Sequence, residues 1–73
     1  MKYPIIIEQA DGNLSAYCPD FPGCAGVGDT VEEAKESIIG AIEIQIEEMT
    51  ADGLEIPQPT AIIDYFHLST QAI

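Results

Sequence analysis

Residues 28–53 decide the fold, and they read GDTVEEAKESIIGAIEIQIEEMTADG. Thr30 and Glu33 fit a capping box, in which two side chains satisfy free backbone N–H groups at the start of a helix. Gly53 stands where a residue just past the C-cap belongs. Between them, apolar side chains recur at steps of three or four and form one stripe: Val31, Ala34, Ile38, Ile42, Ile46 and Met49. The stretch predicts one helix of about 22 residues, roughly 33 Å long, with a single packing face.

A hairpin is predicted before this helix. Residues 2–9 are rich in isoleucine and read as a strand, and residues 14–18 read as its partner. Asp11-Gly12 between them is a strong signal for a type I′ turn, which needs positive φ at both central positions. This turn sets Ile6 opposite Tyr17 on one face of the sheet. The other face is expected to point to the core, and it carries Ile5, Ile7, Leu14, Ala16 and Cys18.

Two further strands complete the expected sheet. Residues 24–28 follow a proline-interrupted loop and form a short third strand. Residues 60–68 form a fourth, with Ile63 and Tyr65 on one side and Ile62, Phe66 and Leu68 on the other. The long helix is expected to return the fourth strand parallel to the first through a right-handed crossover. We therefore predict a single α+β domain over residues 1–73, β-β-β-α-β along the chain, with the helix on a small mixed sheet of order 3-2-1-4. Its core is expected to pair the helix residues Val31, Ile38, Ile42 and Met49 with Ile5, Ile7, Leu14 and Ala16 of the hairpin.

The charge balance is strongly acidic. Thirteen Asp and Glu residues stand against two Lys and no Arg in 73 residues, a net charge of −11. A hydrophobic fraction of 47% argues for a folded domain rather than a disordered acidic chain. Direct nucleic-acid binding is disfavoured because it rests on Lys and Arg neutralising phosphates, so a basic protein or a cation is the natural partner. No stretch has the length of a signal peptide or a membrane span, and we expect a cytoplasmic protein.

No residue pattern predicts an enzyme. His67, the only histidine, has no Ser, Cys or Asp at a spacing typical of a catalytic triad. Cys18 and Cys24 are expected to be reduced thiols because the expected compartment is reducing. A zinc site needs about four ligands, and no cofactor or metal site is predicted. One alternative stays open, a small acidic metal-binding protein or metal-dependent nuclease. Its candidate ligands are carboxylates near strand and loop ends, Asp20, Asp29 and Asp64.

Three segments carry a resemblance to a known family. They read SAYCPDFPGC at residues 15–24, GDTVEEA at residues 28–34 and GLEIPQP at residues 53–59. In combination they resemble the N-terminal domain of HicB-family antitoxins over nearly the whole chain. The resemblance implies a truncated ribonuclease-H-like fold without nuclease activity, and a small basic HicA-type toxin that cleaves mRNA as the partner. Full-length family members often add a C-terminal DNA-binding domain, and we expect this chain to lack one.

The predicted partner surface centres on Tyr17 and the proline-rich loop that follows it. Tyr17 and Phe21 are the expected anchors, because aromatic rings contribute a large share of the binding energy at interfaces. Asp20, Pro22 and Gly23 belong to the same loop. Helix carboxylates are expected to steer a basic toxin toward this surface, namely Glu32, Glu36 and Glu43. The alternative is that Phe21 packs into the core and the carboxylates only keep the protein in solution.

Self-association is expected from apolar residues that one helix cannot cover. At 100° per residue Ile44 points away from the sheet, and Ile6 lies beside Tyr17 on the second sheet face. A homo-oligomer follows, with a cyclic dimer as the simplest case. The sequence thus predicts a binding module that neutralises a HicA-type toxin by covering the surface with which the toxin binds RNA.

Overall fold

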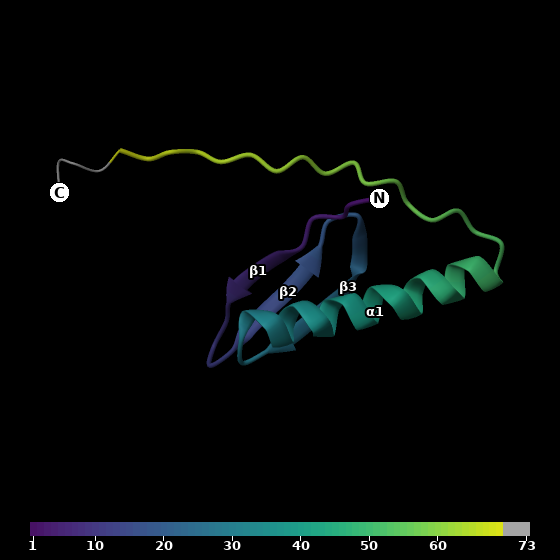
Figure 1. Cartoon of the computed structure of the whole chain (residues 1–73), viewed down its shortest axis with the longest axis horizontal. Helices are drawn as coiled ribbons and strands as arrows, with labels where there is room; N and C mark the ends of the chain where they lie inside the picture. The colour runs from purple at the N-terminus through teal and green to yellow at the C-terminus, as the bar shows by residue number, and fades with distance from the viewer. Residues whose placement is uncertain (70–73) are drawn as a thin grey trace.

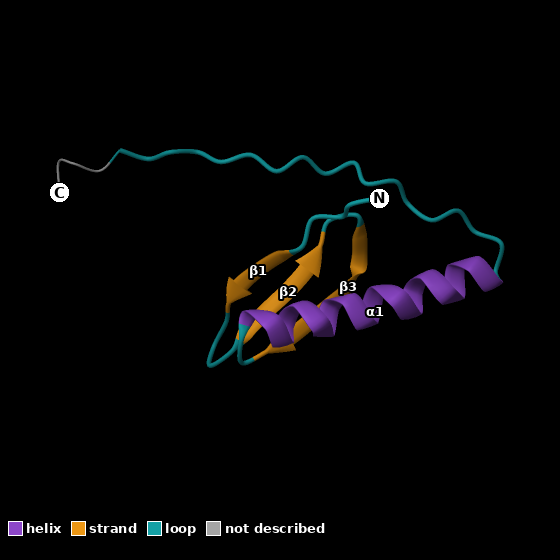
Figure 2. Cartoon of the chain, viewed as in Figure 1, coloured by secondary structure: helices purple, strands orange, loops and turns teal. Residues whose placement is uncertain are grey.

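A three-stranded sheet with one helix across it forms the fold of the computed structural model, which describes residues 1–69 (Figure 1; Figure 2). The strands are β1 (Ile6–Gln9), β2 (Leu14–Cys18) and β3 (Phe21–Gly28), and the helix is α1 (Val31–Ala51). The strands lie in the order β1-β2-β3, each antiparallel to the next. The predicted α+β class and the first three places of the strand order are confirmed. No helix within residues 1–69 is long and apolar enough to cross a membrane.

The register of the first hairpin is as predicted, but its turn is not. Ile6 lies opposite Tyr17 in the β1–β2 ladder. At the turn only Gly12 has a positive φ, of 79°, and no residue other than glycine does so. A type I′ turn needs positive φ at Asp11 as well, so that prediction was wrong. The left-handed region costs an Asp more than a Gly, and here Gly12 alone supplies the reversal.

Both ends of α1 follow the capping signals in the sequence. Thr30 is the N-cap, and its Oγ1 accepts a hydrogen bond from the Glu33 N–H at 3.1 Å. The Glu33 side chain reaches back one residue further than in a standard capping box, and accepts from the Asp29 N–H at 2.9 Å. Gly53, with φ of 71°, follows the C-cap residue Asp52. The predicted boundaries of the helix are therefore confirmed.

Helix α1 lies directly on β3 because β3 has no side chain at two points of contact. A Cβ built on Gly26 would lie 2.5 Å from the backbone N of Ile38. One built on Gly28 would lie 2.5 Å from the backbone N of Ala34. These two glycines of the strand thus let one backbone approach the other. The strand itself begins at Phe21, three residues before the predicted start.

The core lies between α1 and the inner face of the sheet. Its buried members are Ala16, Cys18, Phe21, Cys24, Ala34, Ile38 and Ile42. The predicted hairpin residues Ile5, Ile7 and Leu14 pack half-buried against them. Met49 also packs at the margin, as predicted, but Val31 is exposed and the prediction for it was wrong. The reason is that the sheet ends at Gly28, which meets the helix at Ala34, so the first helical residue lies beyond the contact.

The predicted fourth strand is absent from the described residues. Residues 54–69 run as extended chain without strand pairing, so the sheet is wholly antiparallel and not mixed. This tail leaves the end of α1, passes the N-terminal segment and continues beyond the body of the protein (Figure 1). The radius of gyration is 15.2 Å, against about 11 Å for a compact domain of this length. Strand pairing fails because the tail passes beside residues 2–4 rather than beside β1.

Candidate partner-binding surface

Tyr17 lies on the sheet face that α1 does not cover. Its neighbours across the sheet are Ile6 on β1 and Ala25 on β3. The side chain is 43% exposed. A register irregularity follows it, between Tyr17 and Cys18, where β2 approaches the turn to β3. Tyr17 is therefore presented at the centre of the outer face, as the sequence predicted.

Asp20 is buried and holds the tail. Its side chain is only 9% exposed. Its Oδ1 accepts two hydrogen bonds from Thr60, one from the backbone N–H at 2.9 Å and one from the hydroxyl at 3.0 Å. Its Oδ2 is buried without a hydrogen-bond partner among the described residues. Asp20 is thus a clamp between the loop and the tail rather than an exposed charge that meets a partner.

Phe21 belongs to the core, so the prediction of an exposed anchor was wrong for this residue. It is 3% exposed and sits opposite Cys18 at the end of the β2–β3 ladder. Its ring packs edge-on against Tyr3, with the ring centroids 5.0 Å apart and an interplanar angle of 65°. The Tyr3 hydroxyl donates to the carbonyl of Pro57. The structure therefore agrees with the alternative in which Phe21 packs into the core.

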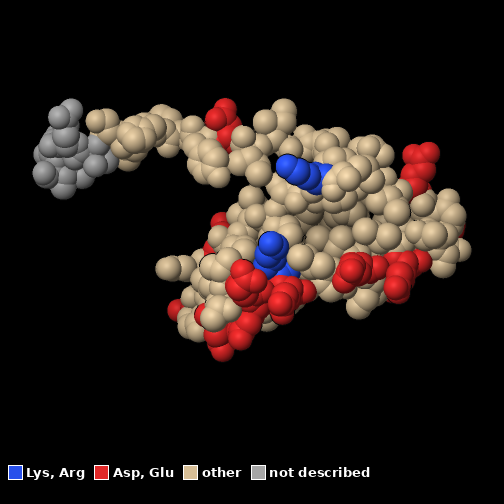
Figure 3. Space-filling model, viewed as in Figure 1, with Lys and Arg blue, Asp and Glu red and all other residues tan. Residues whose placement is uncertain are grey.

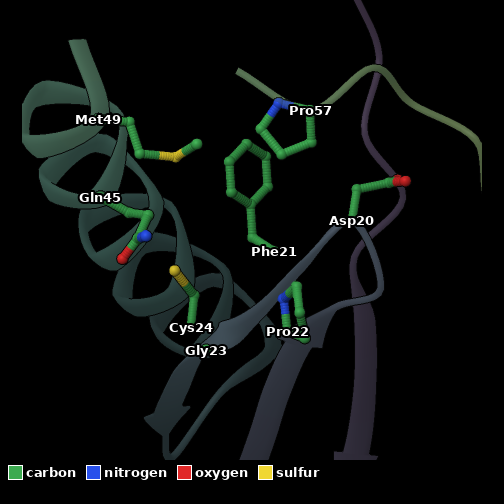
Figure 4. Close-up of a pocket in the computed structure, with 8 residues that line it drawn as sticks. All are labelled: Asp20, Phe21, Pro22, Gly23, Cys24, Gln45, Met49 and Pro57. Atoms are coloured by element: carbon green, nitrogen blue, oxygen red, sulfur yellow. The ribbon is translucent and has the colours of Figure 1, made fainter. Parts of the chain in front are cut away.

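The loop residues also border a pocket of about 240 Å³ between the β2–β3 turn and the last turns of α1 (Figure 4). Figure 4 shows the Phe21 ring between Met49 and Pro57, while the Asp20 carboxylate points away from these side chains. The lining residues are Asp20, Phe21, Pro22, Gly23, Cys24, Gln45, Met49 and Pro57. The structure thus brings four of the predicted site residues together with three from α1 and the tail.

Sequence reasoning missed Gln45, Met49 and Pro57 as neighbours of the loop. They lie more than twenty residues away along the chain, and no local pattern connects them to residues 19–23. Met49 belongs to the apolar helix stripe, which was the one available signal that it faces the sheet side. Pro22 and Gly23 are exposed at the rim.

The three predicted steering carboxylates lie on one side of α1. Glu32, Glu36 and Glu43 are all exposed, and spacings of four and seven residues place them within one narrow stripe. Acidic side chains gather along the helix in the view of Figure 3. Because α1 covers the inner face of the sheet and Tyr17 lies on the outer face, the structure places the carboxylates and the aromatic ring in different layers.

The two residues predicted for self-association do not form one patch. Ile44 is exposed on α1, on the side away from the sheet. Ile6 is half-buried beside Tyr17 on the outer sheet face. The two-layer architecture separates Ile44 from Ile6, so the two residues cannot belong to one and the same interface.

The carboxylates and thiols considered for chemistry lie apart or are buried in the described part of the chain. Within residues 1–69 no three His, Cys, Asp or Glu side chains gather in a group that would hold a metal ion. Asp20, Asp29 and Asp64, the ligands considered for a metal centre, are therefore not brought together. Cys18 and Cys24 are free and buried. Burial, and secondly the nearby Cys18, raise the pKa of the Cys24 thiol above its ordinary value, so this thiol is a poor nucleophile.

Comparison with known protein families gives a match over nearly all of the chain. A family model described as the HicB-like antitoxin of bacterial toxin-antitoxin systems matches residues 3–70. The matched range includes the hairpin, α1 and most of the extended tail. The tail is therefore part of the domain that the family shares.

The chain is also similar to three curated proteins. The UPF0150 protein ssr1765 of Synechocystis sp. is 39% identical over 63 residues, covering 85% of this chain and 80% of that protein. A 14.9 kDa protein of the rep-hol intergenic region of Haemophilus phage HP1 is 39% identical over 67 residues, which is 92% of this chain and 50% of the phage protein. The UPF0150 protein ssl0738 of Synechocystis sp. is 48% identical over 48 residues, which is 64% of this chain and 67% of that protein. No solved structure gives a significant match.

Proposed function

The chain belongs to the HicB-like antitoxin family, and from this premise we propose that it neutralises a small basic toxin of the HicA type. The family match over residues 3–70 is the observation that carries the proposal. The antitoxin would bind the toxin surface that contacts RNA. The toxin would then lose its phosphate contacts, which is inhibition without catalysis. Because the toxin acts on mRNA, the proposed place of action is the cytoplasm.

Charge supports a basic partner. The net charge of −11 leaves the surface with few cations of its own, and the exposed stripe of Glu32, Glu36 and Glu43 gives one side of α1 a row of carboxylates. Complementary potentials accelerate the encounter of two proteins and orient it. The same charge repels RNA, so direct nucleic-acid binding is not part of the proposal.

The outer face of the sheet supplies the proposed anchor. Tyr17 is half-exposed at its centre, and Val27 on β3 is exposed on the same face because the β2–β3 register sets it two residues from Ala25. A tyrosine between small and aliphatic neighbours offers a rigid apolar surface with a polar tip. Phe21 is left out of this proposal because it is buried, and Asp20 because it is occupied by the tail.

The test is a titration of a HicA-type toxin against the full chain at rising salt. The association rate is expected to fall steeply with ionic strength if the carboxylates steer the encounter. Tyr17→Ala is expected to weaken binding by about tenfold or more, the range of an interface anchor. Leu54→Ala, which truncates another exposed apolar side chain outside the sheet, is the matched control. Equal affinity of both folded variants would remove the anchor, and failure of any basic toxin to bind would remove the function.

The steering stripe has its own matched comparison. Two triple variants carry the same change in charge and differ only in position. The first neutralises the stripe with Glu32→Gln, Glu36→Gln and Glu43→Gln, and the second neutralises the exposed glutamates Glu8, Glu48 and Glu55 in the same way. The first is expected to lower the association rate more. Equal effects would assign the steering to net charge alone.

A non-enzymatic role is part of the proposal. Incubation with single- and double-stranded RNA in the presence of Mg²⁺ or Mn²⁺ is expected to leave the RNA intact. Cleavage that disappears in Asp20→Asn or Asp64→Asn would favour a metal-dependent nuclease instead. Self-association is proposed as well. Tyr17, Ile44 and the tail expose large apolar side chains that α1, the one helix, does not cover.

A further inference from the structure

The tail has the side-chain pattern of a β-strand but no strand to pair with. In an extended chain Ile62, Asp64, Phe66 and Leu68 share one side of residues 61–68, and this side is apolar except for Asp64. Ile62 is 92% exposed and Phe66 is 86% exposed. A run of large apolar and β-branched side chains in extended conformation is an incomplete sheet element, because its backbone and its apolar side both lack partners.

The outer edge of β1 is the complementary element. Within residues 1–69 only β2 pairs with β1, so its other edge is open. The Ala10 N–H donates to the Asn13 carbonyl at 2.8 Å, which makes these two residues a hydrogen-bonded pair. Because such pairs alternate along an antiparallel ladder, Ile7 and Gln9 direct their N–H and C=O groups away from β2. They form an unsatisfied edge.

One copy of the chain holds these two elements apart. Thr60 is clamped to Asp20 by two hydrogen bonds, and the Tyr3 hydroxyl binds the Pro57 carbonyl. Ala61 and Ile63 then line a shallow pocket with residues 2–4. Beyond that point the tail runs away from its own sheet (Figure 1). The two hydrogen bonds at Asp20 thus direct the tail away from its own sheet, where a second molecule can bind it.

We propose that residues 60–68 of each copy pair as a β-strand with the outer edge of β1 in a second copy. Two copies exchange these strands reciprocally and form a closed twofold dimer. Each sheet then has four strands in the order 3-2-1-4, with the fourth supplied by the partner. The exchange pairs the open edge of β1 and covers the apolar side of the tail. This inference does not depend on the toxin.

A second copy fits the tail better than a toxin does. The thirteen acidic residues of the chain oppose dimerisation over most of its surface, but Asp64 is the only one within residues 56–69. The tail is correspondingly poor in charge in the view of Figure 3. Five large apolar side chains within residues 60–68 are exposed, and three of them, Ile62, Phe66 and Leu68, lie on the side that the exchange covers. At about 100–150 Å² each, these three side chains on two tails would bury on the order of 600–900 Å², to which the paired strand backbones add further area.

Light scattering on the full chain at moderate salt tests the dimer. The expected mass is twice the 7.9 kDa of one chain. A tail variant with Ile62→Asp and Phe66→Asp is expected to be monomeric and to keep its helical circular dichroism, because neither side chain contacts the core. Ile44→Asp, an equivalent change on the outer side of α1, is expected to remain dimeric. A wild-type monomer, or a dimer lost only in Ile44→Asp, would overturn the proposal.

An edge variant tests the acceptor. Gln9→Pro removes an outward N–H without removing a bond to β2, and Gln9→Ala is its control. Gln9→Pro is expected to be monomeric and Gln9→Ala dimeric. The tail and edge variants each keep one half of the exchange intact, so an equimolar mixture is expected to form heterodimers in native mass spectrometry. A mixture that stays monomeric, or a Gln9→Pro protein that stays dimeric, would show that the tail does not bind β1.

Discussion

Gly26→Ala is the sharpest test of how α1 is seated on the sheet. In the folded chain the new methyl group would lie 2.5 Å from the Ile38 N, 2.9 Å from the Ile38 Cα and 3.0 Å from the Ala34 carbonyl oxygen. All three atoms belong to the helix backbone, so no side chain can rotate away. The helix and β3 must separate by about 1 Å to restore normal contact, and a gap of that size forfeits a large part of the dispersion energy across the interface.

The cost is expected to be about 2–3 kcal/mol, the upper part of the range for overpacked cores. Replacing Gly by Ala also restricts the unfolded chain, which stabilises the folded state by up to about 1 kcal/mol and offsets part of this cost. A domain of 73 residues has a total stability of roughly 4–11 kcal/mol. The net loss is therefore a large fraction of the whole. With a urea slope near 1 kcal/mol/M, the unfolding midpoint is expected to fall by about 1–2 M.

The assay is urea unfolding followed by the helical circular dichroism signal at one fixed protein concentration. Gly23→Ala is the matched control, because a Cβ there meets no heavy atom within 4 Å and the residue does not have positive φ. It is expected to leave the midpoint unchanged or to raise it slightly. If Gly26→Ala and Gly23→Ala unfold at the same urea concentration, the close approach of α1 to β3 is refuted.

Three further predictions concern the core, the clamp and the buried thiol. Ile42→Ala is expected to cost about 2–5 kcal/mol in urea unfolding, whereas Ile44→Ala, exposed on the same helix, is expected to change stability by less than about 0.5 kcal/mol. Thr60→Val removes one of the two hydrogen bonds to a buried carboxylate and is expected to cost about 1–2 kcal/mol, with unchanged stability counting against the clamp. The raised pKa of the Cys24 thiol means that the folded chain keeps this proton more tightly than the unfolded chain. The free energy of unfolding is therefore expected to fall as the pH rises above the pKa of the thiol in the unfolded chain, which is about 8.5. The difference in urea midpoint between wild type and Cys24→Ala, measured from pH 7 to 10, is expected to shrink with rising pH. A constant difference would show that folding does not raise the pKa of this thiol.

Local patterns predicted the elements whose causes are local. Thr30 caps α1 because a side chain near the chain's own backbone can satisfy a free N–H, and Gly53 ends it because glycine accepts positive φ. The register of Ile6 with Tyr17 follows from a two-residue connection between alternating strands. None of these features requires knowledge of distant segments.

Features that depend on distant segments were not predictable in the same way. Asp20 binds Thr60, forty residues away, whereas the sequence suggested a partner contact or a metal ligand for it. Phe21 was predicted to be an anchor because aromatic rings contribute a large share of the binding energy at interfaces, yet Tyr3 and the end of α1 enclose it. For the tail, alternation predicted a strand. A strand also needs a neighbouring backbone, and the pattern of one segment does not identify that neighbour.

The clamp at Asp20 has a geometric consequence further along the tail. Leu68 lies eight residues beyond Thr60, and an extended chain of that length measures about 26 Å. Over such an arm a swing of only about 10° at Thr60 moves the far end by about 4.6 Å, which is the distance between neighbouring strands in a sheet. Two hydrogen bonds to a single carboxylate oxygen therefore set the aim of the whole arm. A change at Asp20 redirects Phe66 and Leu68 without touching either of them.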